Sequence, residues 1–236
     1  MTDQSQYDLS VTSIGYHAMK TGIAHRGVRT RRERERNARR QAILQAAREV
    51  FARSGYHETT LEEIAREAEF GKGTIYNYFS SKEELFDGIL LTLMDEIEAM
   101  ARAAVARPGG ARVKYMQYAL SLLSYISQHS RLFRLVMLEL IRQDAGGYQK
   151  NMERIRERAE QTWRILASPL DEEIRRANRR IPDAVNLAAM FDSMLKASAM
   201  HRAGAYRTLD ASAVEGTAAT IVALFFDGVH GSSVKE

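Results

Sequence analysis

Two capping boxes enclose a short stretch of this chain, and they restrict its fold more than any other feature. Thr60 with Glu63, and Ser81 with Glu84, are placed so that each hydroxyl accepts an orphan backbone amide and each glutamate reaches back to the cap. An apolar stripe at helical spacing follows the first box: Leu61, Ile64, Ala65 and Ala68. The sequence over 69–71 interrupts this helix after about two turns.

A second short helix is predicted over 72–79, where Ile75 and Phe79 lie four residues apart on one face. A longer helix over 35–53 precedes the pair, and its apolar residues are Ile43, Leu44, Ala47, Val50 and Phe51. Two short helices joined by a tight turn and packed on a longer one form a helix-turn-helix unit. The stretch 40–86 is therefore predicted to bind DNA.

The outer face of the helix over 72–79 carries residue types that suit a DNA major groove. Gly73 allows the start of the helix to approach DNA closely, and Lys72 with the free amides there favours phosphate. Asn77 can pair with an adenine edge, and Thr74 can contact a base or a thymine methyl group. Two tyrosines, Tyr76 and Tyr78, flank this face.

The stretch TLEEIAREAEFGKGTIYNYFSSKEEL over residues 60–85 resembles the DNA-binding signature of the TetR family of regulators. The resemblance covers about a fifth of the chain, from residue 40 to about residue 89. It implies an all-α homodimer, with a small N-terminal DNA-binding domain and a larger helical domain for a ligand and for dimerisation. It also implies DNA contacts, mostly to phosphates, by Thr60, Lys72, Thr74, Tyr76, Tyr78 and Lys82.

Two positions of the turn depart from the family pattern, which usually has glycine at position 69 and a serine-like cap at position 71. Glu69 is therefore expected to adopt a turn conformation that glycine reaches more easily, at a cost of about 1 kcal/mol. Gly71 is a tolerable helix cap, and it is expected to supply flexibility one step later.

The rest of the chain predicts helices and no strands, so we expect an all-α fold. After the break at 108–110, helical stretches are predicted over 111–128, 130–143, 148–178, 183–203 and 211–228. The expected organisation is a flexible basic arm over 1–34, a helix-turn-helix domain over 35–86, a helical effector-binding and dimerisation domain over 87–230, and a tail over 231–236.

Arginine is concentrated just before the first predicted helix. Eight arginines stand against only Glu33 and Glu35: Arg26, Arg29, Arg31, Arg32, Arg34, Arg36, Arg39 and Arg40. Such a block is either a solvated tail or an electrostatic footprint for phosphate. Beside a helix-turn-helix unit, we expect it to reach the minor groove or flanking phosphates and to add affinity that does not depend on sequence.

The last two predicted helices are the candidates for a homodimer interface, through a four-helix arrangement with their symmetry mates. The alternative is that they belong to the core of a single subunit. An effector pocket is expected among the helices from 111 to 203. Its candidate residues suit a hydrophobic or amphipathic small molecule: Tyr118, Tyr125, Phe133, Met137, Trp163, Met194 and His201.

Other classes of protein find little support. The chain has no cysteine and no apolar run that could cross a bilayer, which favours a cytoplasmic protein without a membrane partner. Phosphate-loop, dinucleotide, nucleophile-elbow and zinc signatures are missing, so we predict no enzyme, no cofactor and no metal. We expect a repressor that binds an inverted-repeat operator and is released by a small molecule. The alternative is a helix-turn-helix factor controlled by a protein partner.

Overall fold

The computed structural model describes residues 30–144, 149–176, 183–203 and 210–228. The regular structure of these residues is helical throughout, which confirms the predicted all-α fold. The helices are α2 (Arg31–Ser54), α3 (Leu61–Glu67), α4 (Lys72–Tyr76), α5 (Lys82–Val105), α6 (Ala111–Gln128), α7 (Ser130–Asp144), α8 (Gln149–Arg176), α9 (Ala184–Ala203) and α10 (Ala211–Asp227).

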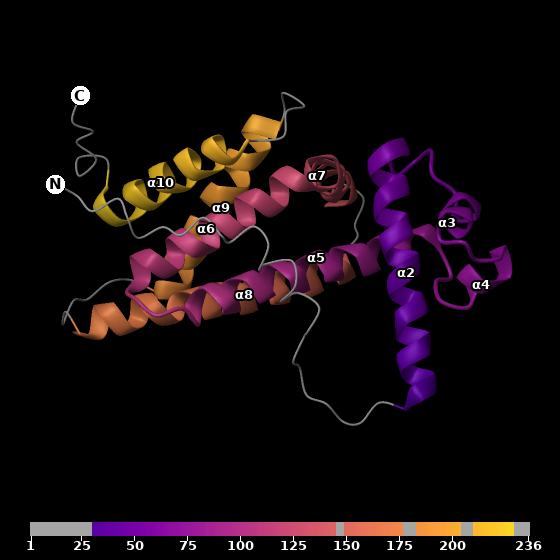
Figure 1. The fold of residues 1–236 in the computed structure, drawn as a ribbon, viewed down its shortest axis with the longest axis horizontal. Helices are drawn as coiled ribbons and strands as arrows, with labels where there is room; N and C mark the ends of the chain where they lie inside the picture. Colours follow the sequence, from indigo (N-terminus) through magenta and orange to yellow (C-terminus); the bar gives the residue numbers. More distant parts are fainter. Residues whose placement is uncertain (1–29, 145–148, 177–182, 204–209, 229–236) are drawn as a thin grey trace.

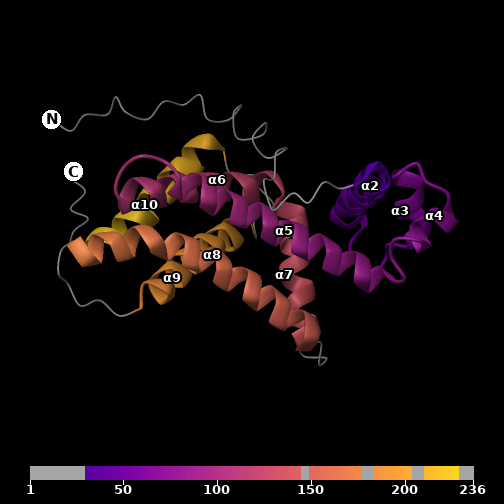
Figure 2. The same ribbon diagram turned by 90° about the horizontal axis from the view of Figure 1, so that it is seen from below.

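The helix-turn-helix unit lies at one end of the molecule. Figures 1 and 2 show α3 and α4 on the outer side of α2, which crosses the first part of α5. From there α5 runs into the C-terminal bundle, where it lies beside α8 and α6, while α9 packs on α8 and α10 packs on α6. The long helix α5 therefore runs from the unit at one end into the bundle at the other, and α2 of the unit also packs against α7.

The unit is built on α2, whose predicted apolar stripe is buried: Ile43, Leu44, Ala47, Val50 and Phe51. Phe51, Tyr56 and Phe86 form an aromatic cluster with ring centroids 5.2–6.3 Å apart, at the point where α2 meets α5. Gly88 permits this close packing, because a Cβ atom there would lie 2.9 Å from Leu44 Cδ2. Buried apolar area of this kind is the main source of stability for a small helical unit.

The first helix begins four residues earlier than predicted, at Arg31 rather than residue 35. Thr30 caps it: the Thr30 hydroxyl accepts from the Glu33 amide, and the Glu33 carboxylate accepts from the Thr30 amide at 2.8 Å. Residues 31–34 of the predicted flexible arm are thus the first turn of a helix. The rest of the arm, residues 1–29, and the predicted tail over 231–236 lie outside the described residues.

Candidate nucleic-acid interface

The short helix α3 is fixed at its start by the capping box that the sequence predicts. The Thr60 hydroxyl accepts from the Glu63 amide at 3.2 Å, and the Glu63 carboxylate accepts from the Thr60 amide at 2.9 Å. On the inner face, Leu61, Ile64 and Ala65 are buried against α2. Thr60 itself is exposed at the surface, so its predicted phosphate contact is compatible with this position.

The turn after α3 contains a strained residue, as the sequence predicts. Among the described residues, Glu69 is the one non-glycine with a positive φ, 57°, which is a left-handed conformation that costs a side-chain-bearing residue free energy. The amide of the next residue, Phe70, closes the turn by donating to the Ala65 carbonyl at 2.8 Å. Gly71 is the N-cap of α4, as expected, but its φ of −65° is open to any residue. The expected relief of strain at Gly71 is therefore wrong, and Glu69 carries the strain itself.

The second short helix, α4, is shorter than predicted, ending at Tyr76 rather than residue 79. The amides of Asn77 and Tyr78 donate to carbonyls three residues back, at 3.2 and 3.0 Å, so the chain tightens before the cap of α5. Ile75 and Phe79 are buried as predicted. Lys72, Gly73, Tyr76 and Asn77 are exposed and Thr74 and Tyr78 are half-buried, which leaves one polar face open to solvent.

An ion pair links this face to α3. Lys72 Nζ lies 2.6 Å from Glu62 Oε1, and the Tyr76 hydroxyl donates to the same oxygen at 3.5 Å. The hydrogen bond from Lys72 holds the pKa of Glu62 below its usual value, and Glu62 in turn raises the pKa of Lys72. Glu62 was not among the residues predicted from the sequence, because nothing in α3 alone shows that it meets α4.

Lys82, another predicted phosphate contact, has an internal role in the free protein. Its ammonium donates to three backbone carbonyls, those of Tyr56 at 2.8 Å, His57 at 3.1 Å and Thr59 at 3.1 Å. It also lies 4.7 Å from the centre of the Tyr56 ring. A charged donor bound to three carbonyls fixes the loop between α2 and α3, and the predicted contact of Lys82 with DNA remains a prediction.

Six of the eight clustered arginines lie on α2, and the other two, Arg26 and Arg29, lie outside the described residues. Residues 31–39 are all exposed, so the first turns of α2 present a basic helical surface beside the recognition unit. Arg40 is half-buried, with its guanidinium 4.9 Å from the centre of the Phe79 ring.

The predicted effector residues separate into several places. Tyr118 and Trp163 meet at a buried carboxylate: the Tyr118 hydroxyl donates to Asp192 Oδ1 at 2.7 Å and the Trp163 indole to Asp192 Oδ2 at 2.9 Å. Lys196 Nζ donates to the same carboxylate at 2.6 Å. Burial, with Asp192 beside it, raises the pKa of Tyr118. Asp192 was not predicted, because its aromatic partners Trp163 and Tyr118 are 29 and 74 residues away in sequence.

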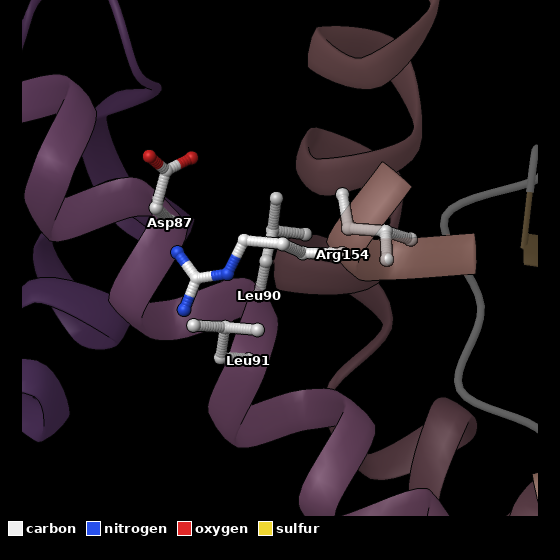
Figure 3. A pocket seen from close by; sticks show the side chains of 5 residues that line it. Asp87, Leu90, Leu91 and Arg154 are labelled. Atoms are coloured by element: carbon white, nitrogen blue, oxygen red, sulfur yellow. The ribbon is translucent and has the colours of Figure 1, made fainter. Parts of the chain in front are cut away.

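The other predicted effector residues do not join this cluster. Tyr125 binds Arg48 and Glu96 at the junction with α2. Phe133 is buried on α7 and His201 is exposed on α9, while Met137 and Met194 are half-buried on those same helices. A small, open cleft between α5 and α8 is lined by Asp87, Leu90, Leu91, Arg154 and Ile155 (Figure 3). It contains none of the predicted effector residues, so their role in binding remains a prediction.

Within the described ranges, no group of three or more His, Asp or Glu side chains is placed to hold a metal ion. None of the helices described is long and apolar enough to span a membrane.

Residues 43–89, which run from α2 into α5, match the family model of bacterial regulatory proteins of the tetR family. This segment is a tetR-family DNA-binding region. The prediction that residues 60–85 carry the DNA-binding signature of this family is thereby confirmed.

The curated relatives match this chain over part of its length. YhgD, an uncharacterized HTH-type transcriptional regulator of Bacillus subtilis, is 46% identical over 67 residues, 28% of this chain and 35% of YhgD. RutR, an HTH-type transcriptional regulator of Escherichia coli, is 36% identical over 110 residues, 46% of this chain and 52% of RutR. The matched segments thus span about half, or less, of these relatives' lengths.

Solved structures of similar fold extend the likeness to the C-terminal bundle. The regulator FadR from Bacillus subtilis, determined in complex with stearoyl-CoA, has a TM-score of 0.68 at 21% identity and covers 80% of this chain and 99% of FadR. A TetR-family regulator from Mesorhizobium loti has a TM-score of 0.67 at 22% identity, with coverage of 84% and 97%. At these identities the likeness concerns the fold.

Proposed function

We propose that this chain is a transcriptional regulator that binds an inverted-repeat operator as a homodimer and responds to a hydrophobic or amphipathic small molecule. The observation that carries the DNA-binding part is the open polar face of α4. Gly73 and Asn77 are exposed there, while Ile75 and Phe79 anchor the helix in the core. Such a helix enters the major groove while the helix before it crosses the backbone.

Dimerisation through α9 and α10 is supported by their outer faces. Met190 on α9 and Leu224 on α10 are large apolar residues with 62% and 40% of their surface exposed. Gly216 lies on the exposed side of α10, where nothing would lie within 4 Å of an added Cβ atom. An exposed glycine inside a helix lowers helix stability, so a second copy packed closely against it would account for its presence.

Part of the predicted dimer seam is intrachain core instead. Phe191 and Leu195 on α9, with Ala218 and Val222 on α10, are fully buried within one subunit. The proposed contact between subunits therefore falls to the outer residues of the same two helices. This accommodates both interpretations of the sequence, since one face of each helix fills the core and the other is free for a partner.

The effector part of the proposal rests on the bundle. Tyr118, Trp163 and Asp192 place polar groups inside an apolar surround, which is the combination found in small-molecule sites. The Bacillus subtilis FadR structure of similar fold holds stearoyl-CoA. A thermal-shift screen of lipids and drug-like compounds tests this part: a compound that stabilises the chain and also releases DNA supports it. Finding only a protein that releases DNA would favour the alternative, control by a protein partner.

A footprint of the purified chain on DNA from its own upstream region tests the proposed function most directly. We expect protection of two half-sites, centred about 34–36 Å or one helical turn apart. Asn77→Ala should then lower the preference for operator over random DNA more than it lowers total affinity. An equal loss on both DNAs would show that Asn77 does not read a base.

A further inference from the structure

Glu62 places a negative charge among the residues that are proposed to face DNA. Its side chain is 46% exposed on α3, and it bridges to α4 through Lys72, whose side chain is 66% exposed. The Tyr76 hydroxyl also reaches Glu62, so the carboxylate lies between two predicted DNA contacts. The lowered pKa of Glu62 keeps this group charged at neutral pH.

The pair changes how Lys72 can contribute to binding. While Glu62 neutralises it, the Lys72 ammonium attracts phosphate weakly, because the two charges nearly cancel at a distance. Exposed ion pairs are weak in water, so a phosphate oxygen can take the place of Glu62 on Lys72. The exchange leaves the Glu62 carboxylate without its cation beside a polyanion, which is unfavourable unless another donor reaches it.

A DNA base can supply that donor. The major groove presents exocyclic amines on cytosine and adenine, and a carboxylate is a natural acceptor for the cytosine N4 amine. Phosphate and the other base edges present acceptors, which a carboxylate repels. The cost of separating Lys72 from Glu62 would therefore be recovered at sequences that place an amine beside Glu62, and at no others.

We propose that Glu62 is a specificity-determining residue of the α4 interface, which accepts a hydrogen bond from an exocyclic base amine in the operator and repels other DNA. The inference rests on the proposed function. It assigns discrimination to a residue of α3, beyond the face of α4 that carries the other predicted base contacts.

Glu62→Gln tests the proposal, because it removes the charge and keeps the shape. The full-length chain is titrated with an operator duplex, selected by the wild type from a random-sequence library, and with a random duplex of equal length, at several salt concentrations. On random DNA we expect tighter binding and a salt slope steeper by about one, since Lys72 is free to bind phosphate. The operator-over-random ratio should fall about tenfold. Repeating the selection with the variant should relax the preference at one position of each half-site.

Glu67→Gln is the matched control. Glu67 lies on the same helix and its carboxylate is 2.8 Å from Arg53 of α2, so the variant loses the same charge beside a different partner. It should leave the ratio and the selected sequence unchanged. If Glu62→Gln changes the affinity for operator and random DNA by the same factor and retains every base preference, the inference is wrong and the proposed function stands. A wild-type chain that selects no sequence would overturn the proposed function and the inference with it.

Discussion

The guanidinium of Arg48 in α2 forms two hydrogen bonds with the carboxylate of Glu96 in α5, at 2.8 and 2.9 Å. Arg48 is buried, and it also donates to the hydroxyl of Tyr125 in α6, which itself donates to Glu96. Three helices therefore meet at one charged cluster, and the cluster joins the helix-turn-helix unit to the bundle. A change in the position of α6 would be transmitted directly to the helix on which the recognition unit is built.

Removing one member of this pair should destabilise the protein strongly. Arg48→Met leaves the Glu96 carboxylate without its main partner, and we expect a loss of about 3 kcal/mol in the free energy of unfolding, measured in urea. The double variant Arg48→Met with Glu96→Leu should recover much of that loss, because an apolar pair needs no compensation. Arg53→Met, which breaks an exposed pair with Glu67, is the control and should change little. If Arg48→Met and Arg53→Met lose the same free energy of unfolding, the Arg48–Glu96 pair is not a stabilising buried pair.

Buried tyrosines should make stability fall at alkaline pH. Burial raises the pKa of Tyr115, Tyr118 and Tyr125 above the usual value of 10.0. Above about pH 10 the unfolded chain loses phenol protons that the folded chain retains, so the free energy of unfolding falls as pH rises and is unaffected below that point. Each such phenol adds about 1.4 kcal/mol per pH unit to the slope.

Tyr118→Phe should flatten the alkaline slope by about 1.4 kcal/mol per pH unit, which unfolding curves at several pH values would measure. The absolute stability of this variant also changes, because Asp192 loses a donor, so the slope is the quantity to compare. Tyr76→Phe, which alters an exposed tyrosine, serves as the control. An identical slope in wild type and Tyr118→Phe would contradict the burial of this phenol.

Replacing Glu69 by glycine should stabilise the helix-turn-helix unit. Glycine reaches a φ of 57° without the clash that a Cβ atom makes, so we expect a gain of about 1 kcal/mol in the free energy of unfolding. Glu58→Gly, in the exposed loop before α3, is the control and should give no gain, because Glu58 does not have a positive φ. A loss of stability in Glu69→Gly would mean that the side chain contributes more than its conformation costs.

The basic start of α2 should add affinity for any DNA. Replacing Arg31, Arg32, Arg34 and Arg36 with glutamine keeps good helix formers but removes four charges. We expect weaker binding to operator and random duplexes alike, and a salt slope smaller by about 0.9 for each phosphate that the variant no longer binds. Deleting residues 1–36 should act in the same direction. Unchanged affinity and slope in both variants would exclude this surface from DNA binding.

The proposed dimer can be tested at Gly216. An arginine there has space in one subunit but would collide with a second copy packed against α10. Sedimentation should show a dimer for the wild type and a folded monomer for Gly216→Arg. Ala103→Arg, on the exposed side of α5, is the control and should remain dimeric. A dimeric Gly216→Arg chain would place the interface elsewhere.

Local signals predicted the DNA-binding unit well, because its structure is determined within a few residues. The Thr60 capping box, the buried Ile75 and the strained Glu69 all follow from neighbours in sequence. The same motif at Thr30 and Glu33 is present in the sequence, and it would have placed the start of α2 correctly. The length of α4 could not be predicted in this way, because the helix ends where the amides of Asn77 and Tyr78 bind carbonyls three residues back.

Interactions between distant helices could not be predicted in the same way. Glu96 and Tyr125 lie 48 and 77 residues from Arg48, and no periodic pattern relates such positions. Tyr125 was therefore assigned to an effector pocket on its residue type alone. A carboxylate or phenol in a helix has the same local signature whether it faces solvent or a buried partner, and only the packing of the helices decides between them.

Because Gly88 has no side chain, the helix-turn-helix unit packs closely on α5, and one added carbon atom at this position would change their spacing. A methyl group there would lie 2.9 Å from Leu44 of α2, and 3.3 Å from both the Arg40 guanidinium and the ring of Phe79 just after α4. All three neighbours belong to the helix-turn-helix unit, so the methyl would push that unit away from α5. For protein engineers, this position offers a way to retune the reach of the DNA-binding unit without altering any residue that faces DNA.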